Sequence, residues 1–381
     1  MNTSAPAPIM KPYVAGIHAY VPGKAALGGR PIVAKLSSNE NPFGPSPKAI
    51  QAMTAVLADA GRYPDPASTA LRAALGARHG VDPDRIICGT GSDELLHLVA
   101  GAFAGAGDEV LYVRHGFAVY DIAARRVGAT PVVAPDRDYT CDVDAVLAAV
   151  TPATRVVFVA NPNNPTGTLI SAAEIRRLHA GLPRHIVFAL DAAYAEFAEG
   201  EYEDGLALAT AHENVIALRT FSKIYGLAAQ RIGWAYASPG IIDAMQRIRA
   251  PFNVPTTRQA GAIAALADEA WTERTRTHTI EWRQWLTGEI EAMGNAGLRA
   301  IPSAANFVLI EFPESGPVSA AAANDALLAD GILTRYLAVQ AMPRCLRISI
   351  GTEAETRAAA ASLRAYVENA TRRVGDKTSR L

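Results

Sequence analysis

The sequence has few cysteines and no long apolar run. Three cysteines occur among 381 residues, Cys88, Cys141 and Cys345, and their spacing fits neither a CxxC motif nor a metal site. A low and odd number of cysteines indicates a reducing compartment. No segment has the length and apolar character of a membrane span, and the first ten residues lack the basic region and apolar core of a signal peptide. These absences predict a cytoplasmic protein with no metal site and no membrane partner.

An excess of charge of either sign is also missing. The chain carries 36 basic and 37 acidic residues, a net charge of -1. This balance argues against binding of nucleic acid or of an anionic membrane and favours small-molecule partners. Half of the residues are hydrophobic, which is typical of a globular protein, and the length predicts one large and one smaller domain.

Short apolar runs alternate with helical patterns from residue 85 onward. Within each run, apolar and polar residues do not alternate, as expected for strands buried on both faces of a sheet. Strands are predicted at 85–88, 110–113, 131–133, 156–159, 186–190, 215–218 and 232–236. Because helices separate most of them, the sequence predicts an α/β fold with a mostly parallel sheet.

The pattern changes after residue 255. One long helix is predicted over 258–293, strands at 306–310 and 346–350, and a final helix over 353–369. We therefore predict three segments. Residues 1–45 form an N-terminal arm and a segment that joins the small domain, 46–255 form the large domain, and 256–381 form the small domain.

Polar residues follow the predicted strands, at the sheet edge where open α/β proteins bind ligands. They are Ser92, Asp93, Phe117, Asn164, Asp191, Tyr194, Ser222, Lys223 and Arg231. Six of them have an ordinary alternative: helix capping for Ser92, Asp93 and Asp191, core packing for Phe117, a simple turn for Asn164, and a solvated loop for Lys223. Taken together they match a planar heterocycle with a phosphate, a protonated ring nitrogen and an aldehyde, which is pyridoxal phosphate. A desolvated lysine such as Lys223 favours its neutral amine, which can form a Schiff base with an aldehyde.

The order of motifs resembles that of fold-type-I pyridoxal-phosphate-dependent aminotransferases. The stretches GSDELL, HGFAVY, NPNNPTG, DAAY, TFSKIYGLA and LRISIGT carry this resemblance. AYVPGK, SSNENPFGPSP, RYPD and EDGLAL further resemble the histidinol-phosphate aminotransferases. The similarity runs from about Tyr20 to Thr352. It implies a large domain with a mostly parallel sheet covered by helices, a smaller α+β domain, and a homodimer with shared active sites.

The resemblance also implies roles for individual residues. Lys223 would bond the cofactor covalently and move a proton, Asp191 would pair with the ring nitrogen, and Phe117 would stack on the ring. Tyr194 and Asn164 would bind the ring oxygen. The remaining cofactor ligands would be Ser92, Asp93, Thr220, Ser222 and Arg231, together with Tyr63 of the neighbouring subunit. The substrate would be bound by Tyr20, Asn39, Arg335 and Arg347.

The implied reaction converts histidinol phosphate and 2-oxoglutarate to imidazole-acetol phosphate and glutamate, a step of histidine biosynthesis. An aromatic amino acid aminotransferase on the same frame is the alternative, and threonine-phosphate decarboxylases are similar as well. A cofactor-sensing regulator would need a DNA-binding module, and no helix-turn-helix pattern precedes residue 85. One departure from the family is Ala229, where glycine is usual. Its methyl group fits if φ is negative there.

Overall fold

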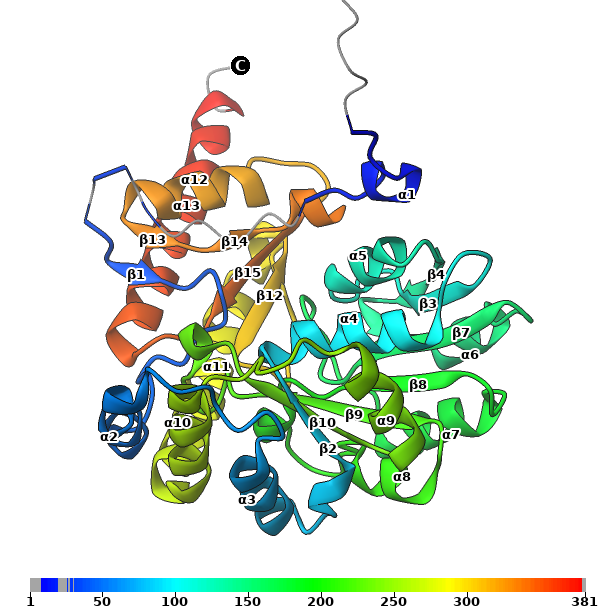
Figure 1. Cartoon of the computed structure of the whole chain (residues 1–381). Coiled ribbons are helices and arrows are strands. Elements are labelled where there is room, and N and C mark those ends of the chain that lie inside the picture. The colour runs from blue at the N-terminus through cyan, green and yellow to red at the C-terminus, as the bar shows by residue number, and fades with distance from the viewer. Residues whose placement is uncertain (1–7, 20–25, 27, 30, 379–381) are drawn as a thin grey trace, which may run out of the picture.

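The computed structural model describes residues 8–19, 26, 28–29 and 31–378, with side chains up to residue 372. Tyr20, predicted to bind the substrate, lies outside these residues. Two sheets organise the chain, a large one and a smaller one that lies above it in Figure 1. Among the described residues, we find no helix with both the length and the apolar character needed to cross a membrane.

The large sheet has seven strands in the order β2-β10-β9-β8-β7-β3-β4. Their bounds are β2 (Ile86–Gly89), β3 (Glu109–Val113), β4 (Thr130–Ala134), β7 (Thr154–Ala160), β8 (Val187–Asp191), β9 (Val215–Thr220) and β10 (Gly233–Ala237). Only β10 runs antiparallel to its neighbours. The prediction of an α/β fold with a mostly parallel sheet is confirmed.

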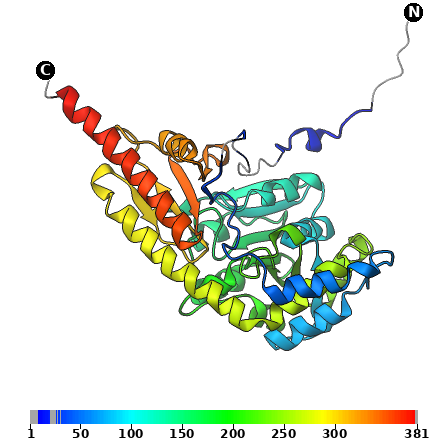
Figure 2. The same ribbon diagram turned by 90° about the vertical axis from the view of Figure 1, so that its left-hand side faces the viewer.

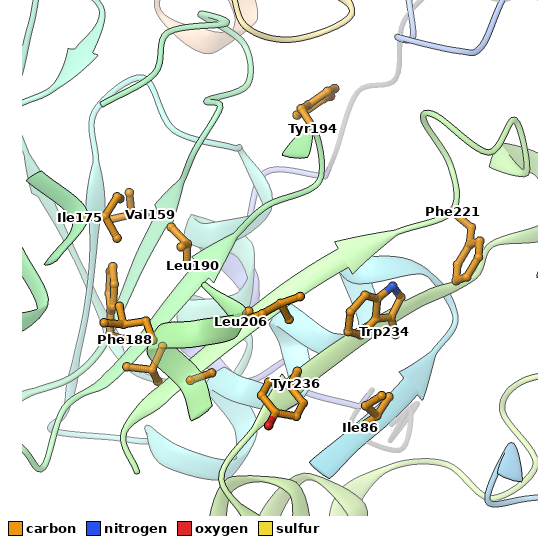
Figure 3. Close-up of a cluster of buried hydrophobic side chains, with 14 of the residues drawn as sticks. Ile86, Val159, Ile175, Phe188, Leu190, Tyr194, Leu206, Phe221, Trp234 and Tyr236 are labelled. Carbon is orange, nitrogen blue, oxygen red and sulfur yellow. The ribbon is translucent and has the colours of Figure 1, made fainter. Parts of the chain in front are cut away.

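Helices cover both faces of this sheet, which explains its uninterrupted apolar strands. Along β7, Val156 and Phe158 pack in one hydrophobic cluster, and Val157 and Val159 pack in the other. The first cluster is completed by α4 (Gly91–Phe103), α5 (Val119–Arg126) and α9 (Pro239–Ile248). The second, shown in part in Figure 3, is completed by α3 (Thr69–His79), α6 (Val143–Ala148), α7 (Ala172–Gly181), α8 (Leu206–Ala211) and α10 (Thr256–Ala267).

The smaller sheet is antiparallel and has its own core. Its order is β11 (Arg299–Ile301), β12 (Phe307–Glu311), β15 (Cys345–Ser349) and β14 (Arg335–Tyr336). Three helices pack on it: α11 (Glu269–Glu291), α12 (Ala320–Ala329) and α13 (Glu353–Thr378). Figure 2 shows α11 and α13 as two long neighbouring helices. The N-terminal β1 (Ala34–Lys35) pairs with β13 (Ile332–Leu333) next to this core.

Two predicted helices differ from those observed. The single helix expected over 258–293 is two helices, α10 and α11, separated at Asp268. Asp268 has φ -96° and ψ 66°, outside the helical region, and its carboxylate binds Lys48 Nζ at 3.1 Å. The final helix continues to Thr378 instead of ending near residue 369.

The remaining elements are short. They are α1 (Pro12–Ala15), α2 (Pro47–Ala55), the hairpin of β5 (Asp136–Arg137) and β6 (Thr140–Cys141), and the 3-10 helices η1 (Leu57–Asp59), η2 (Pro83–Arg85), η3 (Ala195–Phe197), η4 (Ala228–Gln230), η5 (Gly294–Ala296) and η6 (Ala338–Gln340). The three-segment division of the chain stays a prediction. Buried residues of α10 belong to the cluster of the large sheet, which favours a boundary beyond that helix.

Candidate active site

A cavity of about 280 Å³ lies at the carboxyl ends of the parallel strands. All predicted site residues except Tyr20 and Tyr63 line it. They are Asn39, Ser92, Asp93, Phe117, Asn164, Asp191, Tyr194, Thr220, Ser222, Lys223, Arg231, Arg335 and Arg347. Parallel strands bring together residues that are far apart in the sequence, because their carboxyl ends meet at one edge. Strands β14 and β15 of the smaller sheet supply the opposite wall.

Lys223 lies three residues beyond the end of β9. Its Nζ donates a hydrogen bond to the carbonyl oxygen of Ser38 at 3.4 Å and lies 5.6 Å from the centre of the Tyr194 ring. Burial, followed by the positive charge of Arg347, lowers the pKa of Lys223 to about 8. A far larger share of this amine is therefore neutral near pH 7 than for an ordinary lysine, so it is suited to attack a carbonyl carbon.

Asp191 is the last residue of β8 and is buried. Its carboxylate accepts hydrogen bonds from Tyr120 Oη at 2.9 Å and from the Ala193 backbone N–H at 3.2 Å. Burial raises the pKa of Asp191 to about 6, and the hydrogen bond from Tyr120 opposes that rise. A carboxylate in such surroundings favours a cationic partner, as a protonated ring nitrogen would provide.

The start of α4 and the Lys223 loop form a cradle for an anion. Arg231 Nη1 donates to Ser222 Oγ at 3.1 Å, and Nη2 lies 3.2 Å from Asp93 Oδ2. Gly91 has φ +82°, and a Cβ there would lie 2.7 Å from Arg231 Nη2. Backbone N–H groups at the start of a 13-residue helix attract phosphate. The cradle therefore combines a guanidinium, a hydroxyl and a helix N-terminus.

Asn39 and Tyr194 are joined across 155 residues of sequence. Asn39 Nδ2 donates to Tyr194 Oη at 2.9 Å, and the Asn39 backbone N–H donates to Ser349 Oγ at 2.8 Å. Asn39 has φ 55°, in the left-handed region that asparagine tolerates better than most residues. The structure thus places Asn39 against the predicted ring ligand Tyr194 as well as in the cavity wall.

Arg335 and Arg347 are directly opposite each other on β14 and β15. Both side chains are buried, and both line the cavity. Arg347 donates to Asn164 Oδ1 and, at 3.1 Å, to the Ser37 carbonyl oxygen. Two guanidinium groups at one wall make that part of the cavity suited to an anionic substrate.

Tyr63 lies elsewhere on the surface of this chain. Tyr63 is 82% exposed, and its ring stacks on Phe252 with 4.5 Å between the ring centres. This placement leaves the predicted role of Tyr63 in a neighbouring subunit as a prediction. Ala229, in η4, lies outside the left-handed region, so its methyl group causes no backbone strain.

Several residues of the site were not identified from the sequence. Ser38 supplies the carbonyl oxygen that binds Lys223, and Tyr120 supplies the hydroxyl that binds Asp191. Tyr120 stands in the HGFAVY stretch, three residues after Phe117. The sequence pattern places Tyr120 in the helix that follows, but it could not identify the hydrogen-bond partner of Tyr120, because Asp191 is 71 residues away. Ser38 contributes a backbone carbonyl oxygen, which every residue has, so the type of residue at this position does not predict the contact.

The residues present fit pyridoxal phosphate. The anion cradle suits its phosphate, Asp191 its ring nitrogen, Tyr194 its ring oxygen and Lys223 its aldehyde. Phe117 lines the same cavity and has the aromatic face needed for stacking. Each group of the cofactor thus has a chemically matched side chain in one cavity.

Comparison with known proteins gives consistent results. A family model described as aminotransferase class I and II matches residues 31–363. The chain is 55% identical over 370 residues to the histidinol-phosphate aminotransferase of Sphingopyxis alaskensis, covering 96% of this chain and 99% of that protein. It is 54% identical over 370 residues to that of Zymomonas mobilis, covering 97% and 100%.

A solved structure is similar over the same span. Histidinol-phosphate aminotransferase from Sinorhizobium meliloti, in complex with pyridoxal-5'-phosphate, has a TM-score of 0.88 at 32% identity, covering 96% of this chain and 99% of that one. L-threonine-O-3-phosphate decarboxylase from Porphyromonas gingivalis shares the fold at 23% identity, with a TM-score of 0.74. From the matched span and these identities, the chain belongs to the class I and II aminotransferases.

Proposed function

We propose that this chain is a pyridoxal-phosphate-dependent aminotransferase that interconverts histidinol phosphate and 2-oxoglutarate with imidazole-acetol phosphate and glutamate, in histidine biosynthesis. The names of the relatives support this reaction over an aromatic amino acid aminotransferase. The observation that carries the proposal is the pair of buried arginines, Arg335 and Arg347, facing each other on β14 and β15 at the cavity wall.

Both half-reactions present an anion to this wall. Histidinol phosphate carries a phosphate, whereas glutamate and 2-oxoglutarate carry a carboxylate beyond the reacting carbon. A guanidinium can bind either group through two parallel hydrogen bonds. A wall with two arginines can thus serve two substrates of different shape, provided each has its anion at the far end.

Pyridoxal phosphate, when bound, supplies an aldehyde and a ring that withdraws electrons. Lys223 would hold the cofactor through a bond from its Nζ to the aldehyde carbon, the aldehyde oxygen leaving as water, and when free the same amine would carry a proton to and from the substrate's α carbon. Asp191 would hold the proton on the ring nitrogen. Arg231 and Ser222 would fix the phosphate, and Phe117 would hold the ring plane. These residues would orient the reacting atoms within one cavity.

A homodimer with shared sites is part of the proposal. Tyr63 and Phe252 form an exposed aromatic pair, and Ile50 and Leu57 are also exposed, at 50% and 58%. Aromatic side chains are enriched in protein interfaces, so the exposed aromatic pair favours this surface as the dimer contact. Tyr63 would then reach the phosphate in the partner's cavity. Mixed dimers of Lys223→Ala and Tyr63→Ala chains test this, because one of their two sites would contain both native residues. Recovery of activity on mixing supports the shared site, and no recovery contradicts it.

A cytoplasmic location is also proposed. Cys88, Cys141 and Cys345 are all free thiols, and two of them are buried. Cysteines that form no disulfide are typical of proteins in a reducing compartment. Localisation of a fluorescent fusion of the chain would test the proposal.

The test of the reaction is a panel of half-reactions. The protein loaded with pyridoxal phosphate is mixed with histidinol phosphate, glutamate, phenylalanine or tyrosine, and the absorbance of the bound cofactor is followed. We expect histidinol phosphate and glutamate to react, and the two aromatic amino acids to react far more slowly. Release of carbon dioxide in place of a keto product would identify a decarboxylase.

Two arginine variants sharpen this test. Arg347→Ala should slow both half-reactions, because a charge-assisted hydrogen bond contributes about 1.5–3 kcal/mol. Arg335→Ala should slow the reaction of histidinol phosphate more than that of glutamate if Arg335 mainly binds the phosphate. If Arg335→Ala leaves histidinol phosphate unaffected while phenylalanine reacts equally well, the aromatic aminotransferase takes the place of this proposal.

A further inference from the structure

Asp191 has a side-chain hydrogen-bond donor that lies outside the cavity wall. Tyr120 Oη lies 2.9 Å from Asp191 Oδ2, while Oδ1 accepts from the Ala193 backbone N–H at 3.2 Å. Tyr120 is 1% exposed and Asp191 is 5% exposed, so water has little access to this contact. A buried phenol that donates to a buried carboxylate is a costly arrangement to break, because neither group can turn to solvent.

The ring of Tyr120 is held on two sides. It stacks on Phe158 with 4.9 Å between ring centres and an interplanar angle of 6°. It meets Phe117 edge to face, at 5.9 Å and 89°. Tyr120 therefore contacts both the aspartate that would bind the ring nitrogen and the aromatic residue that would stack on the ring.

We propose that Tyr120 is a positioning residue for the aminotransferase reaction: its hydroxyl fixes Asp191 and weakens the carboxylate's hold on protons, so that a bound pyridine ring keeps the proton on its nitrogen. This inference rests on the proposed function for its cofactor. Tyr120 is not among the residues that line the cavity, so it would act through Asp191 and Phe117.

The electrostatics of the pocket explain why such a donor is needed. Burial, and to a lesser extent the charge of Asp93, raises the pKa of Asp191 from its ordinary value to about 6. The Tyr120 hydrogen bond, the Ala193 N–H and the charge of Lys223 act in the opposite direction. Burial also raises the pKa of Tyr120 well above its ordinary value, so the phenol keeps its proton and stays a donor. Without that donor the carboxylate becomes more basic and competes for the proton on the ring nitrogen. A ring that loses this proton withdraws electrons less strongly.

The test uses Tyr120→Phe, which keeps the ring and removes only the hydroxyl. Tyr112→Phe is the matched control, because Tyr112 is 8% exposed and its hydroxyl also binds an aspartate, Asp121, at 3.1 Å. Each protein is loaded with ring-15N-labelled pyridoxal phosphate. The ring-nitrogen resonance reports protonation directly by NMR, and kcat and KM are measured for histidinol phosphate and glutamate.

We expect Tyr120→Phe to move the resonance toward that of an unprotonated ring and to lower kcat about tenfold or more, since a hydrogen bond to a charged group is lost. KM should stay near that of the wild type, because neither arginine of the substrate wall is altered. Tyr112→Phe should change neither the resonance nor kcat.

Three results would overturn the inference. The first is a wild-type resonance and kcat in Tyr120→Phe. The second is an equal loss of kcat and of thermal stability in both variants, which would reduce Tyr120 to a packing residue. The third is a wild-type protein that binds no pyridoxal phosphate, which would refute the proposed function as well. A shifted resonance in a protein that does not react with histidinol phosphate would support the inference while refuting the proposed substrate.

Discussion

In the cofactor-free protein, Lys223 should react with amine reagents at a pH where ordinary lysines are inert. Its pKa is lowered to about 8 from 10.5, chiefly by burial. At pH 7 this makes the neutral fraction of the amine about 300-fold larger than for an ordinary lysine, since each unit of pKa changes that fraction tenfold. The sign is fixed by the chemistry: burial disfavours the ammonium form, so reactivity rises with pH up to about 8 and levels off above it.

The assay is trace acylation between pH 6 and pH 10, with the Lys223 peptide quantified by mass spectrometry. N-acetyl-lysine amide in the same tube provides the reference titration. A weaker base is also a weaker nucleophile, so the pH midpoint is the decisive quantity and the absolute rate is secondary. The Lys223→Ala variant identifies the labelled peptide. A midpoint near that of the reference compound would refute the reasoning, because it would mean that the Lys223 amine is solvated and not activated by the cavity.

Three further outcomes are expected. Asp191→Asn should lower kcat by about a hundredfold or more, because the buried charge pair between Asp191 and the ring nitrogen would lose one partner. Circular dichroism should show an intact fold in this variant. Near-normal rates would mean that Asp191 is only a structural cap. Arg219→Met should lower the free energy of unfolding in urea by about 3–5 kcal/mol, because the Arg219 side chain is 6% exposed and binds two carboxylates. The control, Arg247→Met, removes an exposed ion pair and should lower it by about 0–1 kcal/mol. Equal losses in the two variants would contradict this prediction. Gly226→Ala should lower the free energy of unfolding by more than about 1 kcal/mol, because φ at Gly226 is +68° and an added Cβ would lie 2.1 Å from a backbone oxygen. The control, Gly240→Ala, places its methyl group in open space and should be neutral or stabilising. A neutral Gly226→Ala would contradict the prediction and show that the loop can move aside.

The sequence alone determined the large sheet and most of the cavity. Strands buried on both faces carry uninterrupted apolar residues, so each strand could be recognised from a few neighbouring positions. Because parallel strands end at one edge, Asp191, Lys223 and Arg231 could be expected at one site without coordinates. The pairing of chemical types with the groups of pyridoxal phosphate followed from residue identity, and the motif order then indicated the family.

Helix boundaries and strand direction could be predicted less well from the sequence. Asp268 interrupts a stretch whose pattern reads as one helix, and its departure from helical geometry accompanies a contact with Lys48, 220 residues earlier in the chain. Strand β10 runs against its neighbours although its sequence resembles theirs. Direction depends on how the chain returns between strands, and local composition carries little information about that.

Only the tertiary structure decided which side chains share a hydrogen bond or face each other. Arg335 stands opposite Arg347 because of the register of β14 and β15, Asn39 reaches Tyr194 across the two sheets, and Tyr120 meets Asp191 beneath the cavity. A shift of one residue in the register of β14 against β15 would turn one of these arginines to the opposite face of the sheet. Residue types and strand ends are local properties of a sequence, whereas contacts between distant segments depend on register and packing, which the folded chain alone fixes.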